Sequence, residues 1–132
     1  GPVGQLFYED EGPDHEGPAW FCSGWETFKY HFDHRDMGWE LVVGYMTDYA
    51  SVDYDLYEDG GNTFITAHVE ASAFARLQDL YYVVGTPIRG AMGEDLIPFS
   101  ERDAADAFAT DHDGEVYEYG DVTPTLVGQI GY

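Results

Sequence analysis

The chain of 132 residues carries 26 Asp and Glu against 5 Lys and Arg, which gives a net charge of −21. Such a field repels nucleic acids and anionic membrane surfaces, so we exclude nucleic acid as a partner. Its residues are 44% apolar and 17% aromatic, which excludes disorder and suffices for the core of a single domain over residues 1–132.

The one-signed charge indicates either adaptation to concentrated salt or a cationic partner. Self-repulsion destabilises a compact acidic chain, and molar salt removes most of it because the Debye length falls to about 3 Å. Lys29 is the only lysine, while Asp is abundant. This composition is typical of a halophile's protein, and we expect that origin.

The single cysteine, Cys22, excludes an internal disulfide and a site built from several cysteines. No stretch reaches the roughly 18–20 apolar residues of a spanning helix. The sequence starts at Gly1 without an initiator Met. We therefore expect that a signal or lipid anchor precedes Gly1 in the longer protein.

The first half of the chain reads as strands around one helix. In chain order the patterning predicts a strand at Gln5–Tyr8, a loop at Glu9–Pro18, a buried strand at Ala19–Ser23, a helix at Trp25–Phe32, a strand at Leu41–Tyr49 and an acidic turn region at Asp53–Asn62. The helix is predicted because large residues recur at Trp25, Phe28 and Phe32.

The second half has a similar order of elements, without an internal sequence repeat. The patterning predicts strands at Thr63–Ala67 and Leu80–Val84, a loop at Thr86–Gly93, a helix capped by Ser100 and closed by Gly114, a strand at Val116–Tyr119 and a short last helix capped by Asp121 and broken by Gly128. The sequence thus predicts an α+β fold of two similar β-β-α halves, about 1–62 and 63–132, with mostly antiparallel sheets.

Catalytic patterns are lacking in the sequence. It contains no nucleophile elbow, phosphate-binding loop or His-Glu zinc helix, and among 26 carboxylates pairs of acids arise by chance. Cys22 could form a dyad with a histidine, but beside Trp20 and Phe21 we interpret it as a small buried hydrophobe. His31 and His34 are spaced to reach one ion, yet histidines at a helix C-terminus also favour the dipole without a ligand role.

The three methionines differ in their surroundings. Met37 lies in a polar stretch, and Met46 lies in an apolar strand, where core packing is expected. Met92 lies in the glycine-flanked segment Arg89–Gly93, where small neighbours leave its sulfur accessible. Soft thioether ligands select Cu(I), so Met92 is the candidate metal ligand.

The same segment resembles a known family. The resemblance is carried in the second half by Tyr82–Gly93, Ile97–Phe99, Ala104–Ala109 and His112–Val116, and in the first half by Gly1–Leu6, Pro18–Phe21 with Thr27 and Phe28, and Tyr45–Asp48. These segments are similar to those of the NosL family, the accessory lipoproteins of nitrous-oxide reductase maturation, and they run almost from end to end of the chain.

The resemblance implies a duplicated β-β-α fold related to organomercury lyase, and a metallochaperone rather than an enzyme. It implies a protein that binds Cu(I), is lipid-anchored on the extracytoplasmic face of the membrane, and contacts the membrane only through that anchor. Its partner would be a copper donor or acceptor protein, either a cuproenzyme such as nitrous-oxide reductase or a membrane copper-delivery complex.

Two departures from the family pattern concern the metal site. The family's Cys-x-Met motif precedes the position of Gly1 and is absent here, and Tyr49 replaces a methionine of relatives. Cys22 stands where serine is common, so the resemblance gives it no ligand role. Met92 alone carries over, and we expect weak Cu(I) binding.

Two other functions stay open from the sequence. The chain could be an extracytoplasmic protein-interaction module without metal, docking through aromatic side chains. It could also be an enzyme of the organomercury-lyase type, although that chemistry needs several thiols and only Cys22 is present.

Overall fold

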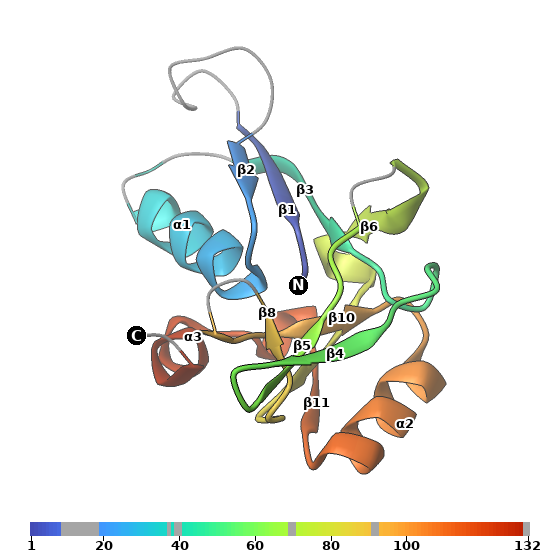
Figure 1. Cartoon of the computed structure of the whole chain (residues 1–132). Helices are drawn as coiled ribbons and strands as arrows, with labels where there is room; N and C mark the ends of the chain where they lie inside the picture. Colours follow the sequence, from blue (N-terminus) through green and yellow to red (C-terminus); the bar gives the residue numbers. More distant parts are fainter. Residues whose placement is uncertain (9–18, 37, 39–40, 69–70, 91–92, 131–132) are drawn as a thin grey trace.

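The computed structural model describes residues 1–8, 19–36, 38, 41–68, 71–90 and 93–130 (Figure 1). The chain forms three sheets, mostly antiparallel, together with α-helices, and so confirms the predicted α+β class. The division into duplicated halves at residue 62 stays a prediction. In the described residues, no helix is both long and apolar enough to cross a membrane.

The first sheet is antiparallel and has the order β2-β1-β3-β6. Its strands are β1 (Gly4–Tyr8), β2 (Ala19–Phe21), β3 (Leu41–Thr47) and β6 (Phe74–Arg76). Helix α1 (Gly24–Asp36) covers one face, over the buried Leu6, Phe21 and Met46. A Cβ at Gly4 would collide with Thr27 of α1, so the glycine permits this close packing.

The third sheet, in the order β10-β7-β11, carries the second helix. Its strands are β7 (Tyr81–Val84), β10 (Ile97–Phe99) and β11 (Glu115–Glu118), and α2 (Arg102–His112) packs against them. Buried Val83, Ile97 and Phe99 meet Ala105 and Phe108 of α2 in a core of their own. The first sheet therefore packs against α1 and the third against α2, while Tyr82 and Val84 on the other face of β7 join the core that α1 covers.

The second sheet, in the order β4-β5-β8-β9, is built from short strands. Its strands are β4 (Leu56–Asp59), β5 (Asn62–Ile65), β8 (Arg89–Gly90) and β9 (Gly93–Glu94), with β5 and β8 parallel. Gly60 and Gly61 have φ of +59° and +84°, as a tight two-residue hairpin turn requires.

The remaining elements are short. They are α3 (Pro124–Ile130) and the 3₁₀ turns η1 (Ala71–Ala73), η2 (Leu77–Asp79) and η3 (Tyr119–Asp121). Helix α3 lies against α1, where the Trp25 indole nitrogen donates to the Val127 carbonyl at 2.8 Å. Residues distant in sequence thus hold α1 from both sides.

Two predicted loops contain strands. The acidic turn region 53–62 includes β4, and the loop 86–93 includes β8. All four residues of β4 are exposed, so this strand has no buried face to produce an alternating pattern. β8 has only two residues, which is too short for any periodicity to be seen.

The predicted helix ends are wrong in detail. Helix α2 has Glu101 rather than Ser100 at its N-cap, and the Ser100 amide donates to the Asp48 carboxylate at 2.8 Å. Its left-handed closing residue is Asp113, with φ of 59°, rather than Gly114.

The last helix also departs from its prediction. Thr123, not Asp121, caps α3, since its hydroxyl accepts from the Leu126 amide at 3.2 Å, and Pro124 occupies the first helical position. The helix continues through Gly128 to Ile130.

Candidate metal-binding site

Met92, the candidate ligand, lies outside the described residues, as does Met37. The strands on either side of Met92 are described: β8 and β9 pair antiparallel, with Gly90 opposite Gly93 and Arg89 opposite Glu94. The residues around β8 and β9 are therefore the ones that would surround a metal ligand placed between Gly90 and Gly93.

Asp95 follows β9 directly and has a buried carboxylate, with the residue only 3% exposed. One of its oxygens, Oδ1, accepts from the amides of Trp25 at 2.7 Å and Leu96 at 2.9 Å, and Oδ2 accepts from the amide of Gly24 at 3.1 Å. The first amides of a helix have no partner within the helix. Asp95 therefore caps α1 across 70 residues of sequence.

Burial raises the pKa of the Asp95 carboxyl to about 7, and the three amide donors offset only part of this effect. The helix N-terminus also favours the carboxylate over the neutral acid. Nothing in the sequence distinguishes Asp95 from the other 25 acidic residues. Its role depends on a long-range contact that neither spacing nor periodicity encodes.

The first residues of the chain lie at the same place. A Cβ built on Gly90 would stand 2.6 Å from Asp95 Oδ2 and 3.4 Å from Pro2 Cδ, so Pro2 and the carboxylate both border β8. Burial lowers the pKa of the Gly1 amine, and the nearby charges of Asp95 and Cys22 oppose this shift. We call this region the Asp95 corner: residues 1–2, 22–25, 89–90 and 93–96.

Cys22 is exposed, so the prediction of a buried thiol is wrong. The prediction assumed that the aromatic and apolar segment Ala19–Ser23 is buried on both faces of its strand. In the edge strand β2 the side chains alternate: Phe21 faces α1 and is 9% exposed, whereas Trp20 is 55% exposed. Cys22 continues this alternation on the exposed side. Because a free thiolate is itself a soft ligand, Cys22 must be controlled for in any copper measurement.

The two histidines of α1 are not brought together around a common site. The Nδ1 of His34 donates to the Tyr30 carbonyl at 2.8 Å, and its ring stacks on Tyr30 with centroids 3.8 Å apart. His31 is buried, and this burial lowers its imidazole pKa. Within the described ranges, no group of three or more His, Cys, Asp or Glu side chains is arranged to hold an ion.

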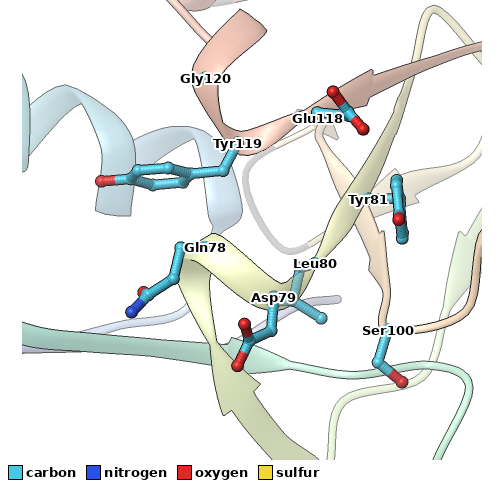
Figure 2. A pocket seen from close by; sticks show the side chains of 8 residues that line it. All are labelled: Gln78, Asp79, Leu80, Tyr81, Ser100, Glu118, Tyr119 and Gly120. Carbon is cyan, nitrogen blue, oxygen red and sulfur yellow. The ribbon is translucent and has the colours of Figure 1, made fainter.

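A hollow of about 490 Å³ lies on another part of the molecule (Figure 2). Its lining residues are Gln78, Asp79, Leu80, Tyr81, Ser100, Glu118, Tyr119 and Gly120. These residues offer carboxylate, amide, phenol and hydroxyl groups, with no sulfur or imidazole. Oxygen donors suit hard cations rather than Cu(I), so this hollow does not fit a soft metal.

A second hollow, of about 340 Å³, borders the Asp95 corner. Its lining includes Glu94 and Asp95 together with Asp113 and Glu115 from the end of α2 and from β11. On this side, β9 therefore faces a hollow lined both by these acids and by apolar side chains, among them Val84, Leu126 and Ile130.

Comparison with known structures shows the same fold. The crystal structure of the copper chaperone NosL from Shewanella denitrificans matches with a TM-score of 0.71 at 24% identity, over 95% of this chain and 81% of that one. The solution structure of apo-NosL from Achromobacter cycloclastes matches with a TM-score of 0.54 at 24% identity, over 94% and 87% of the two chains.

Sequence comparison agrees. The copper-binding lipoprotein NosL of Achromobacter cycloclastes is 28% identical over 128 residues, which are 96% of this chain but 58% of that protein. The protein of the same description from Stutzerimonas stutzeri is 43% identical over 47 residues, 36% of this chain and 25% of that protein. The NosL sequence profile matches residues 1–127, and the chain therefore belongs to the NosL family.

Proposed function

We propose that this chain binds Cu(I) at the Asp95 corner, with the Met92 thioether as a ligand, and passes the ion to a partner protein. The observation that carries the proposal is family membership over residues 1–127, in a family whose compared members are named copper-binding lipoproteins or a copper chaperone. The same membership confirms that the chain is not an enzyme, and so removes the lyase alternative.

The chemistry of Met92 suits this cargo. A thioether is neutral and soft, so it favours Cu(I) over the hard Ca²⁺ and Mg²⁺ ions that the chain's 26 carboxylates attract. A site with few ligands also suits transfer, because a partner can displace one ligand at a time.

Further ligands would come from the Cys-x-Met motif that the family resemblance implies ahead of Gly1. Pro2 borders Gly90 of the hairpin, so a segment joined at Gly1 would begin at the Asp95 corner. The chain spans 58% of the length of the Achromobacter protein, and a longer form of the protein would have room for such a segment. The full site would thus combine a thiolate and two thioethers.

The wider setting follows from the relatives' names. Copper-binding lipoproteins are anchored by a lipid, so we place the full-length protein on the extracytoplasmic face of the membrane. Its partner would be a cuproenzyme such as nitrous-oxide reductase, or the membrane complex that delivers copper to one.

Competition for Cu(I) against bicinchoninate tests the proposal. The chain with Cys22→Ser should bind Cu(I) weakly, and the same chain with Cys-x-Met placed ahead of Gly1 should bind it at least tenfold more tightly, on the order of 1.4 kcal/mol. The gain is expected because ligands on one chain act at a high effective concentration.

A Ser-x-Leu extension of equal length is the control and should give no gain. If the Cys-x-Met chain binds no better than this control, the added motif and the corner do not form a common site.

One observation favours the alternative of a metal-free interaction module. Trp20 is 55% exposed on the face of the first sheet that points away from α1, and its ring packs against Phe74 with centroids 6.3 Å apart. The four strands of this sheet contain no Asp or Glu, in a chain with 26 of them. If no form of the chain binds Cu(I), this surface becomes the leading functional site.

A further inference from the structure

We propose that Asp95 is a positioning residue for metal binding: its carboxylate holds the β8–β9 hairpin against the start of α1 and the first residues of the chain. The inference rests on the proposed function, because the hairpin flanks Met92. Asp95 itself is not a ligand in this account.

The contacts on the helix side are direct. Two of the three amides that Asp95 accepts belong to the first turn of α1, Gly24 at 3.1 Å and Trp25 at 2.7 Å. Trp25 is fixed in turn by its indole hydrogen bond to Val127 of α3. The carboxylate is therefore bound to the first turn of α1, which α3 also holds in place through Trp25.

On the hairpin side the carboxylate lies against backbone. In β8, a Cβ on Gly90 would approach Asp95 Oδ2 to 2.6 Å. At the start of α1, a Cβ on Gly24 would stand 3.0 Å from Asp95 Oδ1. Glycine at both positions leaves the space that the carboxylate fills. Glu94 and Asp95 border the second hollow, so the Asp95 carboxylate lies between that hollow, β8 and the start of α1.

Filling this space with a carboxylate costs free energy, because the charge is removed from water. Burying it raises its pKa to about 7, so the fold disfavours its charge even with three amide donors. Well-packed apolar residues often stabilise a core as well as buried charges do. The carboxylate does what an apolar side chain cannot: its two oxygens accept from α1 and from Leu96 at once.

The test compares Asp95→Asn with Asp48→Asn, both in the Cys22→Ser chain carrying Cys-x-Met ahead of Gly1. Asp48 is a matched control because it is 2% exposed and also accepts three hydrogen bonds, from Ala50, Ser51 and Ser100. Its contacts are to residues outside the Asp95 corner. Asparagine keeps the shape of aspartate, but at position 95 its NH₂ group meets a backbone amide whichever oxygen it replaces. At position 48 the NH₂ group can replace Oδ2 and donate to the Ser51 hydroxyl.

Asp95→Asn should lower the melting temperature, because it leaves a buried backbone donor without an acceptor. Asp48→Asn should lower it less, because the Ser51 hydroxyl can accept from the new NH₂ group. Only Asp95→Asn should weaken Cu(I) binding, by at least tenfold in bicinchoninate competition at pH 8 and a temperature at which circular dichroism shows both variants folded. Equal affinities in Asp95→Asn and the parent, or equal losses in both variants, would overturn the positioning role.

A metal-free readout separates this inference from the proposed function. In amide NMR spectra without copper, Asp95→Asn should shift the Gly90 and Glu94 signals and speed their hydrogen exchange, whereas Asp48→Asn should leave both unchanged. A parent that binds no copper would overturn the proposed function, while unmoved Gly90 and Glu94 signals would overturn the positioning of the hairpin. If Asp95→Asn does not fold, Gly90→Ala, whose Cβ would collide with the intact carboxylate, should shift the Glu94 signal and speed its hydrogen exchange.

Discussion

Replacing Met46 with alanine is expected to lower the free energy of unfolding by about 2–5 kcal/mol. Met46 is fully buried in β3, within the core that α1 covers, and a Cβ on Gly24 would lie 3.2 Å from its sulfur. Removing the side chain leaves a cavity that the close contact between α1 and the first sheet cannot fill. The burial of Met46 also confirms its sequence-based interpretation as a core residue.

Urea denaturation measures this loss, with Leu56→Ala as the control. Leu56 is 36% exposed on β4, so its truncation should change stability by no more than about 0.5 kcal/mol. Similar small losses in both variants would show that the core around Met46 is not tightly packed. Cu(I) affinity should be unchanged by either substitution once the protein is folded.

The melting temperature is expected to climb steeply between dilute buffer and molar KCl. The described residues contain three ion pairs, Lys29–Asp33, Arg76–Asp79 and Arg102–Asp106, and all three are exposed. They involve three of the five cations, so most of the 26 acids repel one another without a cation close by. Salt at 1 M shortens the Debye length to about 3 Å and removes most of this repulsion.

Calorimetry across a KCl series checks this prediction. For a domain of this size each kcal/mol of relieved repulsion corresponds to about 4 °C. Sucrose, which strengthens burial without screening charge, is the control and should act more weakly than KCl. A melting temperature that does not change with KCl would contradict adaptation to salt and favour a cationic partner as the reason for the charge.

The larger elements could be predicted from the sequence because their residues alternate or recur with helical spacing. The strands β1 and β3 and the helices α1 and α2 each have a more buried and a more exposed face, which periodicity detects. Strand β7 is buried on both faces and is predicted instead by its β-branched and aromatic composition. Strand β4 is exposed throughout, and β8 and β9 have two residues each, so none of these three strands produces that signal.

The site could be predicted only in part. Met92 is predicted from its chemistry and from the family resemblance, and both depend on neighbours in sequence. Asp95 and Cys22 were missed or misjudged because their settings depend on contacts between distant segments. The bond from the Gly24 amide to Asp95 spans 71 residues, and the exposure of Cys22 follows from β2 being an edge strand.

The most direct test of the account is the Cu(I) affinity of Met92→Ala, measured by bicinchoninate competition in the Cys22→Ser chain with Cys-x-Met ahead of Gly1. The affinity should fall at least tenfold, about 1.4 kcal/mol, while the unfolding free energy stays close to that of the parent. A Met92→Ala chain that binds Cu(I) as tightly as its parent would contradict the assignment of Met92 and leave family membership as evidence for the fold alone.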